Sequence, residues 1–128
     1  MNNLTKVINV KVKFIRPEYQ NLGEWMDDPN NVYIGRRGIV FIDGERFPKK
    51  DSIWANPFKV KDYDDVEKCC RMYEEYISKK LNSDKNLVKE LLKLEGKNLG
   101  CWCKEKGTYP ARVCHGDVLV KLIQKYSE

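Results

Sequence analysis

Helical periodicity in the middle of the chain, with strand-like segments before and after it, constrains the fold more than any other feature. From residue 64 onward, apolar residues recur at steps of three and four with Glu and Lys between them, which predicts a helix of about five turns. A second helix is predicted over 84–95, with Ser83 as its capping residue. Before these helices, residues 7–15 (VINVKVKFI) alternate apolar and polar side chains and predict a strand with one buried face.

The remaining segments complete an alternating pattern of strands and helices. Residues 31–38 (NVYIGRRG) predict a short strand that enters a turn at Gly35, and residues 16–31 predict a loop with room for one short helical turn. Residues 97–103 (KNLGCWC) predict a short buried strand, and residues 117–126 (DVLVKLIQKY) a closing helix. We therefore expect a small α/β fold with a short central sheet flanked by helices.

An inserted β-hairpin is predicted over residues 38–48 (GIVFIDGERFP). The Asp43–Gly44 pair lies between two apolar segments and suits the positive φ angles of a tight turn. Two further residues, Cys69 and Cys70, lie on the apolar side of the first predicted helix, so core packing is the favoured interpretation for both.

Length and composition predict one soluble domain over residues 1–128. Hydrophobic residues make up 41% and charged residues 34% of the 128, which is typical of a globular protein. No apolar run approaches the roughly 18 residues of a membrane span, and the start lacks the features of a secretory signal. The five cysteines are an odd number, which favours free thiols over a disulfide framework. We expect an intracellular, reducing compartment: the cytoplasm, or the host cytoplasm for a viral protein.

Charge permits a nucleic-acid partner without requiring one, and no membrane partner is expected. The net charge is +5, and acidic residues are spread among the basic ones. The chain is also rich in Lys and Asn, as proteins of AT-rich genomes are, including viral ones. Binding through charge alone would weaken steeply as salt rises.

Three cysteines and the only histidine of the chain fall within residues 101–115. On a strand, Cys101 and Cys103 project to the same face. A loop of ten residues then leads to Cys114 and His115 at the start of the last helix, where unpaired backbone N–H groups favour a thiolate or another anion. The sequence therefore places a Cys/His cluster where a strand, a loop and a helix meet.

Four interpretations of this cluster stay open. As a zinc site, it would use the Cys₃His set of Cys101, Cys103, Cys114 and His115, although this spacing is not the usual C-x₂₋₄-C pattern. As a catalytic site, Cys101 or Cys114 would be the nucleophile, His115 the proton carrier and Asp117 an orienting acid or base. As an anion site, Gly116 and the helix N-terminus would receive a phosphate. The fourth interpretation is core packing of small thiols.

Two loops supply further candidate ligand-binding residues. Tyr33, Gly35 and Arg36 combine an aromatic ring, a turn and a guanidinium that can bind phosphate, although a solvated basic turn is an equal alternative. Trp54 and Asn56 offer a stacking face and an amide for a base or sugar edge, with anchoring of the loop to the core as the alternative.

Three sequence blocks together resemble the uncharacterised domain-of-unknown-function 4326 family, which occurs in bacteria, phages and large DNA viruses. They are NVYIGR at 31–36, SIWANPFKV at 52–60 and the block from 96 to 123, which contains GCWC and CHGDVL. The chain departs from the family pattern in two places: the hairpin segment between Arg36 and Trp54, and a longer loop from Cys103 to Cys114.

The resemblance implies that twelve residues occupy shared motif positions, without assigning a role to any of them: Tyr33, Gly35, Arg36, Trp54, Asn56, Pro57, Cys101, Cys103, Cys114, His115, Gly116 and Asp117. The leading hypothesis is binding, with or without processing, of a nucleotide or nucleotide-derived ligand at the Cys/His cluster, which is expected at the carboxyl edge of the sheet. The alternative is a non-enzymatic zinc-stabilised module that binds nucleic acid or a protein. Zinc is the one cofactor that the sequence suggests.

Overall fold

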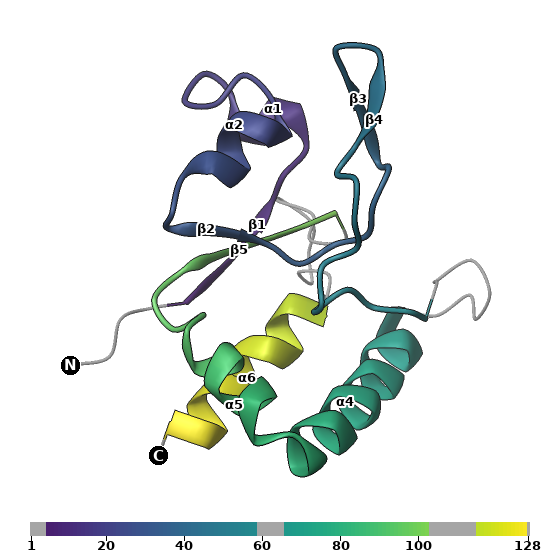
Figure 1. Ribbon diagram of the computed structural model, residues 1–128, viewed down its shortest axis with the longest axis vertical. Helices are drawn as coiled ribbons and strands as arrows, with labels where there is room; N and C mark the ends of the chain where they lie inside the picture. The colour runs from purple at the N-terminus through teal and green to yellow at the C-terminus, as the bar shows by residue number, and fades with distance from the viewer. Residues whose placement is uncertain (1–4, 59–65, 103–114, 128) are drawn as a thin grey trace.

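Three parallel strands form the centre of the structure, with helices on both of their faces (Figure 1). The computed structural model describes residues 5–58, 66–102 and 115–127. Its elements, in chain order, are β1 (Lys6–Asn9), α1 (Val12–Ile15), α2 (Leu22–Asp27), β2 (Asn31–Tyr33), β3 (Val40–Ile42), β4 (Glu45–Phe47), α4 (Val66–Ser83), α5 (Lys85–Leu92), β5 (Asn98–Cys101) and α6 (His115–Ser127).

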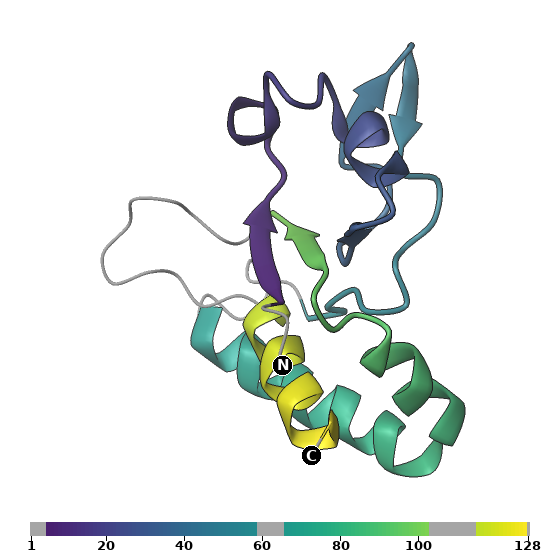
Figure 2. The same ribbon diagram turned by 90° about the vertical axis from the view of Figure 1, so that its left-hand side faces the viewer.

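Strand β5 lies in the middle of the sheet, between β1 and β2. Asn9 of β1 lies opposite Cys101, and Tyr33 of β2 lies opposite Gly100. Helices α1 and α2 cover one face of the sheet, and α4, α5 and α6 cover the other (Figures 1 and 2). The predicted α/β fold, with a short central sheet flanked by helices, is confirmed.

Two apolar cores lie on the two faces of the sheet. The larger core joins the sheet to α4, α5 and α6, and Leu99 and Cys101 of β5 face it. The smaller core contains Val10, Ile15, Leu22, Trp25 and Tyr33. Cys69 and Cys70 are 1% and 7% exposed, which confirms that both are buried.

The first strand is shorter than predicted. The pattern over residues 7–15 predicts one strand, but β1 ends at Asn9, and residues from Val12 to Ile15 form helix α1. At the turn, the side-chain oxygen Oδ1 of Asn9 accepts a hydrogen bond from the backbone N–H of Lys11 at 3.0 Å. The strand stops because β5 offers only four residues for pairing, and a strand without a ladder partner has no advantage over a helical turn.

The two middle helices are confirmed, with one correction at their junction. Helix α4 has 18 residues, as the predicted five turns require. Ser83 is not the cap of α5, because its hydroxyl donates to the carbonyls of Lys79 and Lys80 at the end of α4. The cap is Asp84, whose extended backbone lets Oδ1 accept from the N–H groups of Asn86 and Leu87. No helix within the described ranges is both long enough and apolar enough to cross a membrane.

The inserted hairpin is confirmed as β3 and β4. Asp43 and Gly44 have φ angles of 53° and 81°, as a tight turn with two positive φ angles requires. At the base, the backbone N–H of Gly38 donates to the carbonyl of Pro48 at 2.8 Å, and that of Ser52 donates to the carbonyl of Gly35 at 3.0 Å. The two ends of the inserted hairpin therefore lie close together, so the chain segments before and after it remain adjacent.

We predict that Gly100→Ala destabilises the fold by about 1–3 kcal/mol, because an added methyl group overpacks the smaller core. Its Cβ would lie 2.6 Å from Cγ1 of Val10 and would overlap the ring of Trp25. Denaturant unfolding measures the change. The control is Gly23→Ala in α2, where the nearest heavy atom would be 3.2 Å away; equal effects of the two variants would contradict the packing described here.

Candidate functional site at the carboxyl edge of the sheet

The carboxyl ends of all three parallel strands meet at one edge of the sheet, at Asn9, Cys101 and Tyr33. After β1 the chain continues into α1 and α2 on one face, whereas α6, the helix after β5, packs on the other face (Figures 1 and 2). Open α/β sheets bind ligands where neighbouring connections leave on opposite faces. The candidate site is therefore the edge formed by the ends of β1, β5 and β2.

His115 fastens the start of α6 to this edge. Its Nε2 lies 2.8 Å from the carbonyl oxygen of Ile34, the residue after β2. Because a carbonyl oxygen can only accept, Nε2 carries the proton of this hydrogen bond. The imidazole is 6% exposed, and it meets the ring of Tyr73 edge-on with 5.1 Å between ring centroids. These contacts make His115 a link between α4, α6 and the end of β2.

Tyr73 extends the link to the loop that follows the hairpin. Its hydroxyl donates to the carbonyl oxygen of Trp54 at 2.6 Å. Trp54 itself is 3% exposed and belongs to the larger core, while Oδ1 of Asn56 accepts from the backbone N–H of Phe58 at 2.9 Å. Trp54 and Asn56, the two residues of this loop that the sequence suggests as ligand contacts, therefore help to anchor the loop and fix its shape.

Tyr33 holds the turn after β2. Its hydroxyl donates to the carbonyl oxygen of Arg36 at 2.6 Å and accepts from the indole Nε1–H of Trp102 at 2.8 Å. Burial raises the pKa of Tyr33 to about 12, against the opposing effects of the Trp102 hydrogen bond and the Arg36 charge. The turn needs glycine at Gly35, because an added Cβ would lie 2.5 Å from the Tyr33 hydroxyl oxygen.

Arg36 carries a buried polar atom with no hydrogen-bond partner among the described residues, its guanidinium nitrogen Nη1. A buried donor without an acceptor costs about 1–3 kcal/mol. The next residue differs, since Arg37 is exposed and its backbone N–H donates to Oδ1 of Asp51 at 2.8 Å. Arg36 therefore offers a donor that an anionic ligand could satisfy.

The edge is tightly packed on the side that faces α6. Cys101 is 0% exposed, and Asn9, its neighbour in register, is 3% exposed. Helix α6 lies close to β1 at Gly116, where an added Cβ would be 2.8 Å from Cγ1 of Val7 and 3.1 Å from Cδ1 of Ile34. Gly116 thus has a packing role at the start of α6.

The zinc interpretation stays a prediction. Cys103 and Cys114, two of its four ligands, lie outside the described residues. Within the residues that are described, no group of three or more His, Cys, Asp or Glu side chains could hold a metal ion.

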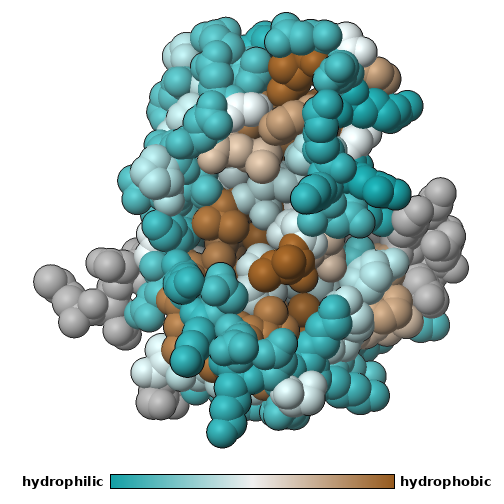
Figure 3. Space-filling model, in the orientation of Figure 1, coloured by the Kyte–Doolittle hydropathy of each residue, from teal (hydrophilic) through white to brown (hydrophobic). Residues whose placement is uncertain are grey.

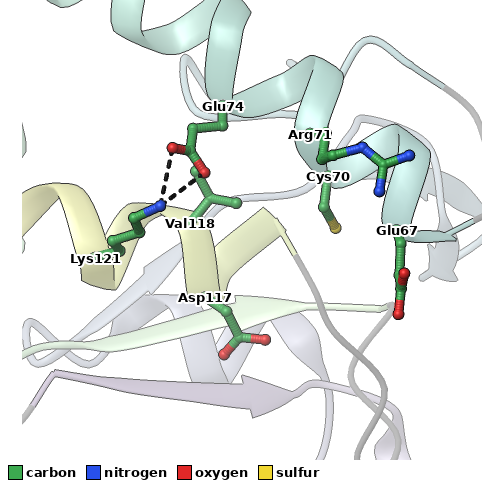
Figure 4. A pocket seen from close by; sticks show the side chains of 7 residues that line it. All are labelled: Glu67, Cys70, Arg71, Glu74, Asp117, Val118 and Lys121. Carbon is green, nitrogen blue, oxygen red and sulfur yellow. Dashed lines mark hydrogen bonds and ion pairs between the residues drawn. The ribbon is translucent and has the colours of Figure 1, made fainter.

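Asp117 lies in a separate pocket of about 340 Å³ between α4 and α6 (Figure 4). Figure 4 shows the Cys70 sulfur and the Asp117 carboxylate on facing elements of this pocket. Nζ of Lys121 lies 3.0 Å from Oε2 of Glu74 at one end of it. The structure therefore groups Asp117 with side chains of α4.

Three residues of the site escaped sequence reasoning: Asn9, Tyr73 and Trp102. The sequence does contain a signal for Asn9. Strand alternation places this polar residue on the same buried face as Val7, where an apolar residue is expected. Trp102 lies between two candidate cysteines, where strand alternation points it to the opposite face, and its indole contacts Tyr33. Nothing in the sequence distinguishes Tyr73 as a site residue, because it occurs at the same three- and four-residue steps as the other apolar residues of its helix.

We predict that the raised pKa of Tyr33 makes stability fall in alkaline solution. The tyrosine of the unfolded chain ionises near its ordinary pKa of 10.0, whereas the folded one stays protonated to about 12. Its contribution is therefore fully present below pH 10 and is lost as the pH rises to about 12. Denaturant unfolding of the wild type and of Tyr33→Phe should show a stability difference that shrinks over this range, and a constant difference would contradict the assignment.

Comparison with known proteins identifies the family of the chain. Residues 18–125 match the family described as "Domain of unknown function (DUF4326)". The Uncharacterized protein R718 of Acanthamoeba polyphaga mimivirus is 38% identical over 105 residues, which cover 75% of this chain and 71% of the mimivirus protein. No solved structure matches the chain. The chain therefore belongs to the DUF4326 family, as its three sequence blocks indicate.

Proposed function

We propose that this protein binds a nucleotide or a related small phosphorylated ligand at the carboxyl edge of its parallel sheet. The observation that carries the proposal is the buried Nη1 of Arg36, which has no hydrogen-bond partner among the described residues. A guanidinium can donate two parallel N–H hydrogen bonds to two oxygens of a phosphate group. A phosphate group would therefore satisfy the donor that the protein leaves unsatisfied.

The backbone that carries Arg36 is held in advance of binding. The Tyr33 hydroxyl bonds the carbonyl of Arg36 itself, and His115 bonds the carbonyl of Ile34 two residues earlier. A donor held in place loses little conformational entropy when the ligand binds. The N-terminus of α6 begins at the same edge with His115, and its dipole favours a negative charge there.

The aromatic partner of such a ligand differs from the one that the sequence suggests. Trp54 and Tyr33 are 3% and 6% exposed, so neither ring offers a face to a base. Trp102 follows the last residue of β5, is only partly buried, and is oriented by its bond to Tyr33. We therefore assign the stacking role to Trp102.

The proposal is one of binding, without a catalytic step. Cys101, one of the two candidate nucleophiles, is 0% exposed, and Nε2 of His115 is engaged by a backbone carbonyl. The other candidate nucleophile, Cys114, lies outside the described residues. Metal analysis of protein purified without chelator addresses the zinc alternative, which requires about one zinc per chain.

We predict that Arg36→Gln weakens binding of nucleoside diphosphates and inorganic pyrophosphate at least tenfold, the usual cost of losing a hydrogen bond between charged groups of about 1.5–3 kcal/mol. Isothermal titration calorimetry measures the affinity. The loss of Nη1 itself should not lower the stability of the free protein, because that nitrogen has no partner among the described residues.

Arg16→Gln is the matched control, since it removes the same charge from an exposed side chain that lines neither proposed site. It should change affinity no more than about twofold, as expected for a screened surface charge. The proposal fails if none of these probes binds the wild type, or if the two variants lose affinity equally.

A further inference from the structure

We infer that the inserted hairpin β3–β4 binds single-stranded nucleic acid through its outward face and through the basic hollow at its base. The inference rests on an exposed aromatic ring and a group of cations on the same element. It does not depend on the Arg36 site.

One face of the hairpin is packed and the other is open. Val40 and Phe47 pack against the smaller core, whereas Phe41, on the opposite side of β3, is 65% exposed. Among the described residues, the exposed large hydrophobic side chains are Ile39, Phe41 and Ile53, and two of these three belong to the hairpin segment. Figure 2 shows the hairpin projecting at the end of the molecule away from α4, α5 and α6, and Figure 3 shows hydrophobic side chains among hydrophilic ones at that end.

The exposed ring has a cation beside it. Phe41 and Arg46 are directly opposite each other in the two-stranded sheet, and Cζ of Arg46 lies 4.8 Å from the centroid of the Phe41 ring. A ring and a guanidinium plane are the two surfaces on which proteins stack unpaired bases. Arg46 covers part of the Phe41 ring, but the residue is still 65% exposed, so the pair offers an open stacking surface.

A hollow of about 440 Å³ lies at the base of the hairpin, lined by Arg37, Gly38, Arg46, Pro48 and Lys49. Three of these five residues are cationic and none is acidic. Nη1 of Arg46 donates to the Gly38 carbonyl at 3.1 Å, which fixes the guanidinium over the hollow.

The neighbouring acids leave these cations available. Lys49 pairs with Glu45 at 2.9 Å, but the two side chains are 71% and 70% exposed, so the pair is worth little and a phosphate can replace it. Asp51 is engaged by the backbone N–H of Arg37. The hollow thus suits the phosphates of a polynucleotide whose bases reach Phe41.

Charge and stacking together favour a single strand over the other occupants. A duplex keeps its base faces stacked and would leave Phe41 without a role, whereas every unpaired base offers a flat face. An apolar protein partner would instead have to cover three cations, and interface cores are depleted in charge.

The test is fluorescence anisotropy with labelled oligonucleotides of about 12 nucleotides, oligo(dT) and oligo(U), at salt concentrations from about 50 to 200 mM. Phe41→Ala should weaken binding about fivefold or more, the usual loss for one stacked base, while Phe41→Trp should retain it. The combined variant Arg37→Gln, Arg46→Gln and Lys49→Gln should reduce the salt slope by about 2.

The matched control removes three exposed charges from α4 and α5, by Lys79→Gln, Lys85→Gln and Lys89→Gln, and should leave affinity and salt slope close to those of the wild type. A difference between oligo(dT) and oligo(U) would identify the preferred strand. The inference is overturned if Phe41→Ala binds like the wild type, if a duplex binds as tightly as a single strand, or if the control lowers affinity as much as the hairpin variant. Self-association that Phe41→Ala abolishes, without oligonucleotide binding, would also overturn it. Binding of mononucleotides at Arg36 is measured separately, and neither result there decides whether the hairpin binds a single strand.

Discussion

Pairing of β5 between β1 and β2 is the interaction on which the rest of the structure depends. The backbone N–H of Val10 donates to the carbonyl of Cys101 at 3.1 Å, and that of Ile34 donates to the carbonyl of Gly100 at 2.9 Å. These bonds join a segment near the end of the chain to two segments near its start. Without these bonds the carboxyl ends of the strands would not lie at one edge. Helix α6 would then have no sheet to pack against, and His115 would not reach the end of β2.

The contacts at this edge explain why the three sequence blocks occur together in one chain. His115 contacts the first block at Ile34, and Tyr73 joins His115 to the second block at Trp54. Several motif residues thus hold the edge in shape and are too buried to contact a ligand. Arg36 differs from them, because the residue is only half-buried and its Nη1, although buried, has no hydrogen-bond partner among the described residues.

Patterns that depend on local chemistry could be predicted from the sequence, and those that depend on distant partners could not. The Asp43–Gly44 turn and the length of α4 follow from neighbouring residues alone. The end of β1 depends on how many residues β5 offers, and the burial of Trp54 depends on α4. Sequence reasoning also could not separate Arg36 from Arg37, because only the fold buries a nitrogen of the first and exposes the second.

The most direct measurement of the central claim, that the carboxyl edge with Arg36 is an anion site, is an NMR titration of the protein with inorganic pyrophosphate. The guanidinium Nε–H of Arg36 and the indole Nε1–H of Trp102 report on the edge, and the side chain of Arg16, which is exposed and lines neither proposed site, reports on non-specific binding. The account predicts saturable shifts of the Arg36 and Trp102 signals, with little change at Arg16. Unchanged Arg36 and Trp102 signals, or equal shifts at Arg36 and Arg16, would contradict it.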